Sequence, residues 1–388
     1  MEWKEVTLGE ISSKIGDGLH GTPKYDDEGP YYFINGNNLN CGKIIIKDDT
    51  KRVGKDEFVK NQKELNEQTI LVSINGTIGN VAKYNNELCI LGKSACYINV
   101  IKEVDKEFIY YVLTSANFKR NITNEATGTT IKNVSLKQMR EYKFNIPCNI
   151  SDQRRIASIL SSLDRKIELN NKINADLEEM AQAIFKNWFV DFEPFKDGKF
   201  VDSELGMIPE GWKVGTLGDF CNVFTGKKNT NQAIEKGLYP FFSCAPEPLA
   251  SNDAIFNGKA IIIAGNGSYT GRTMFYNGGF DLYQRTYACT IREQDKENLM
   301  IFFYHMMKQF FEPVKMGGTR GSSIPYIVMG DITQQKFPYS KDWLIRFSNI
   351  ANSMMDRKLR IDKENSRLSL LRDTLLPRLM SGELEVPE

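Results

Sequence analysis

A long run of regularly spaced apolar residues near the middle of the chain restricts its fold more than any other sequence feature. From Asp152 to Trp188 the apolar positions alternate spacings of four and three residues, and the run contains no Gly or Pro. This is the 3.5-residue period of a helix with one continuous contact seam. Ser151 and Asp152 supply the expected N-cap. Such a helix would be about 55 Å long, which suits a spacer between globular segments.

The end of the chain carries a second, related run. Residues 164–177 read DRKIELNNKINADL, and residues 356–368 read DRKLRIDKENSRL. The second seam is weaker because Arg357 and Glu364 occupy seam positions, and Pro377 is expected to end that helix. Either run alone could be an ordinary amphipathic helix on a globular core. Two copies, each placed after a β-rich segment, favour paired rods instead.

The predicted seam combines apolar residues with two asparagines. Its members are Ile156, Leu160, Leu163, Ile167, Asn170, Asn174, Leu177, Ile184, Ile350, Met354, Ile361, Leu368, Leu371 and Leu375. Asn170 and Asn174 have two interpretations. They fix the register and pairing of the rods at some cost in stability, or they face solvent where the seam twists away. We favour a role in register.

The globular parts are also duplicated, which gives the order globule, rod, globule, rod. Three segments of the first half recur in the second: Trp3–Glu10 in Trp212–Asp219, Ile70–Gly79 in Ile261–Gly271, and Ala126–Val134 in Gly317–Ile327. The second pair reads as a buried strand followed by a Gly-rich turn, and the third as a Gly/Thr/Ser loop. Expected strands are Tyr31–Ile34, Lys43–Ile46, Ile70–Ile74, Val81–Tyr84 and Ala95–Val100, and expected helices are Lys106–Asn117, capped by Asp105, and Glu297–Phe311.

Composition narrows the class of protein. A chain of 388 residues exceeds one core, and 41% hydrophobic with 26% charged residues is an ordinary soluble balance. The opening MEWKEV does not resemble a signal peptide, and apolar runs such as Ala260–Ala264 are too short to cross a bilayer. Seven cysteines without a CxxC pair indicate buried reduced thiols in a cytosolic protein. With a net charge of +1, any DNA binding would need local basic loops or a basic partner.

The motifs that would make this chain an enzyme are incomplete. Gly265–Gly271 has the spacing G-x-G-x-x-x-G and precedes an expected strand, so a pyrophosphate would find no helix N-terminus there. Gly92–Ser94 resembles the end of a Walker A loop, but Glu87 stands where that motif requires Gly. His20 and His305 have no partners at metal-ligand spacing, and no adjacent prolines occur. We therefore expect no catalytic residue, no metal site and no cofactor in this chain.

Both rods and the repeated domain opening resemble a known family. The central segments Asp152–Leu160, Leu163–Asn170 and Phe185–Phe192 are similar to the central conserved region of type I restriction-modification specificity (S) subunits. Leu371–Leu384 resembles the distal conserved region of that family, and Trp212–Asp219 resembles the opening of its target recognition domains. The resemblance covers the whole chain in the family's order.

The resemblance implies an α+β fold of two similar mixed α/β globular target recognition domains, separated by two long α-helices packed as an antiparallel coiled coil. The expected boundaries are 1–150 and 194–340 for the recognition domains, and 151–193 and 341–388 for the helical spacers. Each domain would read one half of a bipartite, asymmetric site on double-stranded DNA, with the spacer setting the gap. Methyltransferase (M) subunits, expected to number two, and restriction/motor (R) subunits would carry S-adenosyl-methionine, ATP and Mg. The complex would be cytoplasmic, without a membrane partner.

DNA-contact candidates follow from residue type and position in the Gly-rich and polar loops. In the first domain they are His20, Thr22, Lys24, Asn35, Asn37, Asn38, Asn75, Thr77, Thr129, Thr130 and Lys132. In the second they are Lys227, Lys228, Asn229, Asn266, Ser268, Arg272, Arg320, Ser322 and Ser323. Arg and Lys suit guanine or phosphate, Asn suits adenine, and Ser and Thr mostly contact phosphates.

Two other functions stay open on the sequence. The chain could serve another methyltransferase-based defence system, or it could be a protein scaffold that does not bind DNA. An enzyme with a cofactor at Gly265–Gly271 ranks last. Sequence-specific retention of DNA by the chain with its methyltransferase partner would exclude the scaffold.

Overall fold

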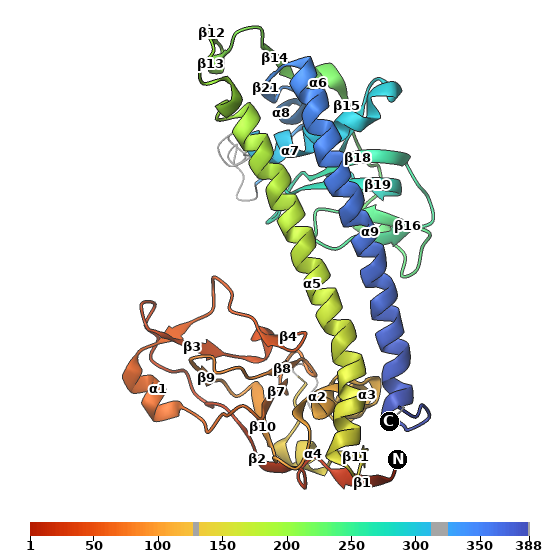
Figure 1. The fold of residues 1–388 in the computed structure, drawn as a ribbon. Coiled ribbons are helices and arrows are strands. Elements are labelled where there is room, and N and C mark those ends of the chain that lie inside the picture. The colour runs from red at the N-terminus through yellow and green to blue at the C-terminus, as the bar shows by residue number, and fades with distance from the viewer. Residues whose placement is uncertain (127–131, 312–324, 387–388) are drawn as a thin grey trace. The chain divides into compact units, whose positions relative to one another are not determined.

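The fold contains two compact units that are not contiguous in sequence. A computed structural model describes residues 1–126, 132–311 and 325–386. Unit 1 comprises Met1–Leu169 and Glu364–Glu388, and unit 2 comprises Asn170–Lys363. Two long helices, α5 (Ile150–Phe189) and α9 (Lys341–Met380), each contribute one part to unit 1 and the other part to unit 2 (Figure 1).

The start of α5 differs from the prediction by two residues. The Asn149 side chain accepts a hydrogen bond from the backbone N–H of Ser151 at 2.9 Å, and the helix begins at Ile150. Asn149 is therefore the N-cap, because its oxygen satisfies an N–H group that the first turn leaves free. The predicted cap at Ser151 and Asp152 was wrong.

The end of α9 also lies beyond its predicted position. The helix passes through Pro377 and ends at Met380, and Ser381 N–H donates to the Pro377 carbonyl at 3.0 Å. A proline in the last turn removes only one intrahelical hydrogen bond, and burial of Leu379 in the core of unit 1 favours completing that turn. Gly382, at φ +76°, ends the helix in the left-handed conformation.

In each unit the two long helices pack antiparallel. In unit 1, Arg372 donates to Asp164 at 2.8 Å, and Lys166 pairs with Glu364 at 3.6 Å. Residues later in α5 therefore contact residues earlier in α9, as an antiparallel pair requires.

Unit 2 repeats this arrangement with other side chains. Glu178 pairs with Lys358 at 3.3 Å, and the ring centroids of Trp188 and Trp343 lie 4.9 Å apart. The predicted fold class, with two long helices packed antiparallel, is confirmed.

Two predicted seam residues are on the wrong face of α9. Ile350 is 36% exposed and Leu371 is 46% exposed, whereas Ala351 and Met355 are buried. Straight helices have 3.6 residues per turn, so a strict 3.5-residue reading drifts away from the true contact face. The neighbour of Leu371, Arg372, takes the inward position and binds Asp164. On α5, Ile156 and Leu160 are fully buried.

The two seam asparagines are buried. Asn170 is 1% exposed and Asn174 is 7% exposed. Asn174 Nδ2 donates to Asp362 on α9 at 2.6 Å, so this pair links the two helices within unit 2. Burial removes the solvent-facing interpretation, and the role in register stays a prediction.

Unit 1 surrounds a β-rich core with short helices. Its four-stranded sheet has the order β2 (Ser12–Asp17), β10 (Ala95–Val100), β7 (Thr69–Ser73), β8 (Val81–Lys83). The smaller sheets are β1 (Trp3–Thr7) with β11 (Lys143–Pro147), β6 (Arg52–Val53) with β3 (Tyr31–Ile34) and β9 (Cys89–Leu91), and β4 (Leu39–Asn40) with β5 (Lys43–Ile44). The helices are η1 (Gly36–Asn38), α1 (Lys55–Asn61), α2 (Lys106–Thr114), α3 (Ala116–Glu125) and α4 (Leu136–Glu141).

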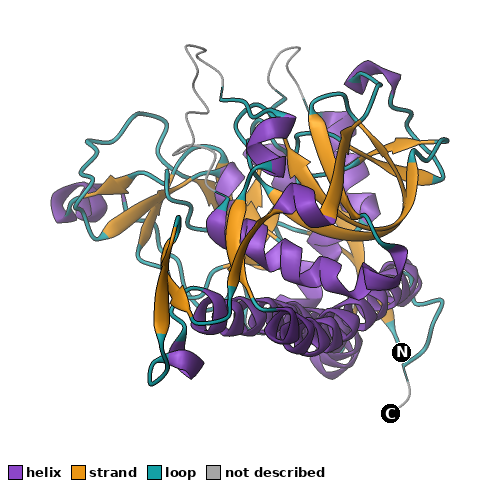
Figure 2. Cartoon of the chain, turned by 90° about the horizontal axis from the view of Figure 1, so that it is seen from above, coloured by secondary structure: helices purple, strands orange, loops and turns teal. Residues whose placement is uncertain are grey.

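Unit 2 has the same plan with a larger sheet. Six strands run in the order β15 (Cys221–Thr225), β20 (Thr286–Ile291), β18 (Phe256–Ala264), β19 (Thr273–Leu282), β16 (Tyr239–Phe242), β17 (Leu249–Ser251). Two further antiparallel pairs are β14 (Lys213–Thr216) with β21 (Lys336–Tyr339), which are distant in sequence, and the hairpin of β12 (Phe200–Ser203) with β13 (Gly206–Pro209). The helices are η2 (Glu193–Phe195), α6 (Leu217–Phe220), η3 (Thr230–Gln232), η4 (Gln294–Leu299), α7 (Met300–Phe310) and α8 (Met329–Thr333). Figure 2 shows strands throughout both units.

The shared plan confirms the duplication read from the sequence. In both units the first strand of the repeated sequence pairs with the strand that precedes a long helix, β1 with β11 and β14 with β21. Both openings end in the same local cap, in which Thr7 and Thr216 bind the carboxylates of Glu10 and Asp219. Each unit also has one parallel strand pair, β3 with β9 and β16 with β19.

The single helix expected over 106–117 is two helices. Asp105 caps α2 as predicted, accepting from Phe108 N–H at 2.9 Å. The helix ends at Thr114, and Ser115 accepts from Phe118 N–H at 3.2 Å to start α3. A serine that can serve as N-cap interrupts the helix because its hydroxyl competes for the backbone.

All seven cysteines are free thiols, but Cys41 and Cys148 are exposed, contrary to the expected burial.

Candidate functional site

In unit 1 the Gly-rich turn after β7 is held against the segment that leads to α4. Asn75 and Asn133 form an isolated antiparallel bridge. Gly76 N–H donates to the Lys132 carbonyl at 3.1 Å, and Val134 N–H donates to the Ile74 carbonyl at 2.9 Å. Two loops that the sequence repeat singled out are therefore neighbours.

Unit 2 contains the same connection after β18. Asn266 and Tyr326 form the isolated bridge. Gly267 N–H donates to the Pro325 carbonyl at 3.1 Å, and Ile327 N–H donates to the Gly265 carbonyl at 2.9 Å. At φ +83° Gly267 has the left-handed conformation that this tight turn needs, as does Gly76 at +74°.

A third segment completes this frame in unit 1. Leu19 and Gly92 form a parallel bridge, and Lys93 N–H donates to the Leu19 carbonyl at 3.0 Å. Ile74 N–H donates to the Ser94 carbonyl at 3.0 Å. The frame thus places the side chains of His20, Asn75 and Lys93 around one spot.

The matching backbone bonds of unit 2 define equivalent positions. Lys228 and Tyr283 form the parallel bridge, Gln284 N–H donates to the Lys228 carbonyl at 3.0 Å, and Gly265 N–H donates to the Arg285 carbonyl at 2.9 Å. His20, Asn75 and Lys93 therefore correspond to Asn229, Asn266 and Gln284. We call these regions the junction surfaces: His20, Asn75, Lys93 and Lys132 in unit 1, and Asn229, Asn266, Gln284 and Arg285 in unit 2.

The junction surface of unit 1 borders a polar cavity of about 280 Å³. Its lining includes His20, Asn75, Lys93, Asp17 and Ser135. His20 Nε2 lies 2.7 Å from Asp17 Oδ2, which fixes the imidazole although its side chain is 71% exposed. Lys93 is exposed and has no side-chain partner among the described residues. The cavity therefore offers hydrogen-bond donors at an open surface.

The junction surface of unit 2 carries amides and one free cation. Gln284 Nε2 donates to Asn229 Oδ1 at 2.6 Å, and Cys244 Sγ–H donates to Asn266 Oδ1 at 3.0 Å. Arg285 is exposed, and within residues 132–311 and 325–386 nothing is recorded as binding its guanidinium group. Arg272, a predicted contact, instead donates to the Ala245 carbonyl at 2.6 Å.

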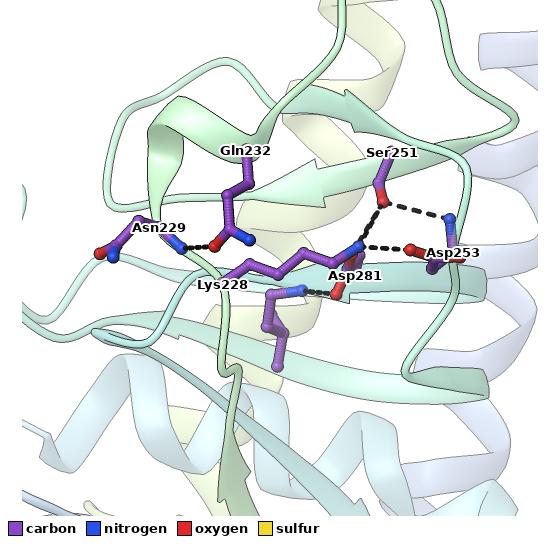
Figure 3. Close-up of polar contacts among 7 residues, drawn as sticks. Lys228, Asn229, Gln232, Ser251, Asp253 and Asp281 are labelled. Carbon is purple, nitrogen blue, oxygen red and sulfur yellow. Dashed lines mark hydrogen bonds and ion pairs between the residues drawn. The ribbon is translucent and has the colours of Figure 1, made fainter.

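Lys228 points into unit 2 instead of outward (Figure 3). Its ammonium lies 2.6 Å from Asp281, 2.7 Å from Asp253 and 3.1 Å from the Ser251 hydroxyl. The Asp281 side chain is 6% exposed and also accepts from Ser251. A lysine neutralised by two carboxylates adds little positive potential at the surface, so Lys228 has a structural role.

Asn38 is also an internal residue. It is 4% exposed, donates to the Ile45 carbonyl at 3.0 Å and accepts from Asn35 N–H at 3.0 Å. Its side chain holds the η1 loop together. Asn35 accepts from the Ser94 hydroxyl at 3.0 Å, next to Lys93.

The remaining predicted contacts are less well localised. Exposed positions that do not line the cavity are Thr22, Lys24, Asn37, Thr77, Lys227 and Ser268. Five predicted contacts lie outside the described residues: Thr129, Thr130, Arg320, Ser322 and Ser323. Sequence reasoning missed Asp17, Lys93, Gln284 and Arg285. Alignment of the two halves through their strands could have found the last three, because each lies in the turn that leads into β10 or β20.

A tyrosine–carboxylate pair ties each globular part to the long helices of its own unit. In unit 1, Tyr111 O–H donates to Asp164 at 2.7 Å, and in unit 2, Tyr304 O–H donates to Glu178 at 2.7 Å. Burial alone would raise the pKa of Glu178, but hydrogen bonds from Lys308 and Tyr304 lower it to about 2. The carboxylate therefore stays ionised within this contact.

His305 in unit 2 is a buried residue of the core. It is 1% exposed, and its Nδ1 lies 2.8 Å from Gln182 Oε1 on α5. Burial lowers its pKa to about 4. Within the described ranges, no group of three or more His, Cys, Asp or Glu side chains could hold a metal ion. A search of the same residues finds no helix with the length and hydropathy to span a membrane.

Two copies of one β-rich frame, each presenting a polar junction surface and each joined to antiparallel long helices, define a protein with an internal structural duplication. Comparison with known proteins specifies the class. The model of the type I restriction modification DNA specificity domain matches residues 1–179 and 209–341. The chain belongs to this family.

Specificity subunits from other organisms are similar in sequence over nearly the full length of the chain. The MjaIX specificity subunit of a type I restriction enzyme from Methanocaldococcus jannaschii is 26% identical, over 95% of this chain and 87% of the relative. The HindI specificity subunit from Haemophilus influenzae is 23% identical, over 99% of this chain and 100% of the relative. The crystal structure of a type I S subunit from M. genitalium has the same fold, with a TM-score of 0.59, 20% identity, and coverage of 100% of this chain and 97% of that one.

Proposed function

We propose that this chain is the non-catalytic DNA-specificity subunit of a type I restriction-modification enzyme. Each unit reads one half of a bipartite, asymmetric site on double-stranded DNA. The presence of two equivalent junction surfaces on one chain, with different side chains at matching positions, is the observation that carries this proposal. A duplicated frame with unlike surfaces suits an asymmetric split site better than a palindrome.

The residue types of both surfaces suit contact with base edges. Lys93, Lys132 and Arg285 are exposed, and cations of this kind bind guanine or phosphate. Amides such as Asn229 and Gln284 can pair with adenine. Since the chain has a net charge of +1, binding to the DNA backbone would rely on a few local cations and on partner subunits.

The long helices are the proposed spacer. Each of α5 and α9 has 40 residues and runs without interruption from one unit into the other. A helix of that length is about 60 Å long. A stiff antiparallel pair would set the number of unread base pairs between the half-sites, and the boundaries 1–150, 151–193, 194–340 and 341–388 remain our proposed division of the chain.

The chemistry is proposed to lie on partner subunits. Methyltransferase subunits, two per complex, would supply S-adenosyl-methionine, and restriction/motor subunits would supply ATP and Mg. The chain itself would carry no cofactor and would work in the cytoplasm. Similarity to type I specificity subunits across the length of the chain supports this division of labour.

Mapping of methylated bases tests the proposal directly. In cells that carry this gene and its methyltransferase partner, we expect one split motif to be methylated, and we expect deletion of either gene to remove it. The purified complex should retain duplexes with both half-sites and release duplexes in which either half is scrambled. Unchanged methylation after deletion, together with no sequence preference in the complex, would favour a scaffold. A continuous motif would contradict the assignment of one half-site to each unit.

A further inference from the structure

At two equivalent positions the two units carry different hydrogen-bonding groups. Backbone bonds of the shared frame equate Lys93 with Gln284 and His20 with Asn229. Lys93 and Gln284 lie on the turns that lead into β10 and β20. His20 and Asn229 lie on the segments that follow the neighbouring strands β2 and β15. The backbone frame is the same in both units. A difference between the side chains at these positions therefore changes which groups are offered to a ligand, while the positions of the side chains stay the same.

Unit 1 presents one cationic donor that the described residues leave unpaired, beside the carboxylate of Asp17 and the amide of Asn75. The Lys93 ammonium has three N–H donors and no acceptor, and it is exposed with no partner among the residues that the structure describes. Next to it in the cavity lining, His20 commits Nε2 to Asp17 at 2.7 Å. The neighbouring Asn75 donates to Asn133 at 3.2 Å. The free polar group best placed to reach out is therefore the lysine ammonium, which requires an acceptor.

Unit 2 presents one donor and one acceptor. Gln284 Nε2 donates to Asn229 Oδ1 at 2.6 Å, which holds the two exposed amides together. This bond uses the Asn229 oxygen and one Gln284 N–H. Asn229 Nδ2 and Gln284 Oε1 have no partner within the described part of the chain. The pair therefore offers an N–H donor beside a carbonyl acceptor.

The base edges in the major groove of DNA distinguish a lone donor from a donor–acceptor pair. Guanine presents two acceptors, O6 and N7, whereas adenine presents the N7 acceptor beside the N6 amino donor. An ammonium matches guanine and cannot accept from the adenine or cytosine amino groups. A donor–acceptor pair of amides matches adenine.

We propose that Lys93 reads a guanine in the half-site of unit 1, and that the Asn229–Gln284 pair reads an adenine at the corresponding place in the half-site of unit 2. This inference rests on the proposed DNA-reading function. It adds which residue decides which base. His20, which is held by Asp17, lines the same cavity as Lys93.

A lysine ammonium can bind a phosphate oxygen as well as a guanine base. A base contact and a phosphate contact differ in how much they depend on the DNA sequence. A base contact of this type discriminates by about 1 to 3 kcal/mol, equivalent to roughly 5- to 150-fold in affinity. Loss of a phosphate contact weakens binding to all sequences equally and lowers the salt dependence of binding.

The experiment uses the complex of this chain with its methyltransferase partner. After the motif has been mapped, binding is measured on duplexes in which each base pair is replaced in turn. We expect Lys93→Gln to lose discrimination at one G·C pair of one half-site and to keep it in the other half. Gln284→Ala and Asn229→Ala should each lose discrimination at one A·T pair in the opposite half, and the double variant should lose no more than either single one.

The matched control is Lys102→Gln, which removes the same charge from an exposed residue beyond the other end of β10. It should leave the base preferences unchanged. Equal weakening by Lys93→Gln on all duplexes would assign Lys93 to phosphate and overturn the proposal, as would unchanged base preferences in all three variants. If the wild-type complex itself shows no sequence preference, the proposed function fails, which is a different result.

Discussion

The buried carboxylate of Asp281 depends on the residues that bind it for its stability in the folded chain. The carboxylate is almost completely buried and accepts hydrogen bonds from Lys228, Ser251 and the Leu282 N–H. A buried charge of this kind is stable only while its partners remain. Lys228 therefore matters through the fold of unit 2.

Replacing Lys228 with Met tests this role. Because the substitution leaves Asp281 without its cation, we expect the free energy of unfolding of the chain to fall by about 2 kcal/mol. The additional change Asp281→Asn should recover much of that loss, because it removes the orphaned charge. Urea unfolding measures both variants. If Lys228→Met kept its stability but lost DNA binding, the lysine would be a DNA contact after all.

His305 makes the stability of unit 2 depend on pH. Burial lowers its pKa from 6.5 to about 4 in the folded chain, so between these values the unfolded chain binds more protons. The groups that face it are Glu178, Gln182, Lys308 and Lys358. We expect the free energy of unfolding to be constant above about pH 6.5 and to fall by up to about 3 kcal/mol as the pH drops to 4.

The variant His305→Gln should remove that dependence and keep an amide partner for Gln182. Denaturant unfolding from pH 4 to 8 measures it. His20→Gln is the matched control, because His20 is exposed, and its pH profile should resemble that of the unchanged chain. A wild-type profile that is flat between pH 4 and 6.5 would contradict the buried neutral state of His305.

Individual roles were the hardest part to predict from sequence. Residue type and loop position selected His20 and Asn75, which line one cavity, but they could not show that Lys228 folds onto Asp281 or that Asn38 is internal. Those partners are distant in sequence, so no local pattern announces them. Lys93 was visible only as a failed Walker A motif, whereas its function as a surface cation depends on how the strands pair.

The long helices were predictable as elements because their signal is repeated over many turns. Periodicity gave α5 within two residues at its start, and it gave the relation of α5 to α9. The face of α9 was less predictable. Neighbouring residues such as Ile350 and Ala351 fit the period about equally well, and packing against the rest of unit 2 decides between them.

The spacer proposal predicts the effect of lengthening both helices. Seven residues inserted between Leu169 and Asn170, and seven between Lys363 and Glu364, keep the seam in phase and add about 10 Å to each helix. We expect the methylated motif to keep both half-sites and to gain at most about three unread base pairs between them.

An insertion in α5 alone is the matched control. It shifts one seam by seven residues against the other, so polar pairs such as Asn174–Asp362 lose their register. We expect this variant to lose methylation at the original motif without gaining a new one. If the variant with both insertions kept the original number of unread base pairs, the two long helices would not set the spacing between the half-sites.

At the scale of the whole molecule, the duplicated architecture could be predicted, but the noncontiguous make-up of unit 1 could not. Sequence order suggests four successive parts, whereas Leu379 of α9 is buried in the core that contains Val6 and Phe108. The Trp3 ring lies against Gly382, where an added Cβ would come within 2.8 Å of its indole nitrogen. Tertiary packing of this kind leaves no local pattern in the sequence.

A chain that ends at Lys363 should therefore lose the fold of unit 1 and keep that of unit 2. The deletion removes Leu379 from the core of unit 1 and removes the Arg372 partner of Asp164. Hydrogen exchange should show unprotected amides in β7 and protected amides in β18. Addition of a peptide with residues 364–388 should restore protection in β7. Equal protection of β7 in both chains would contradict this dependence.

Because unit 1 is completed by residues 364–388, its first 169 residues depend during translation on a part of α9 that is synthesised after the whole of unit 2. A polypeptide that stops early would carry at most one finished unit. If each unit reads half of a site, every such fragment would be unable to direct its partners to a full motif. The order of the chain would thus make synthesis of α9 a condition for targeting.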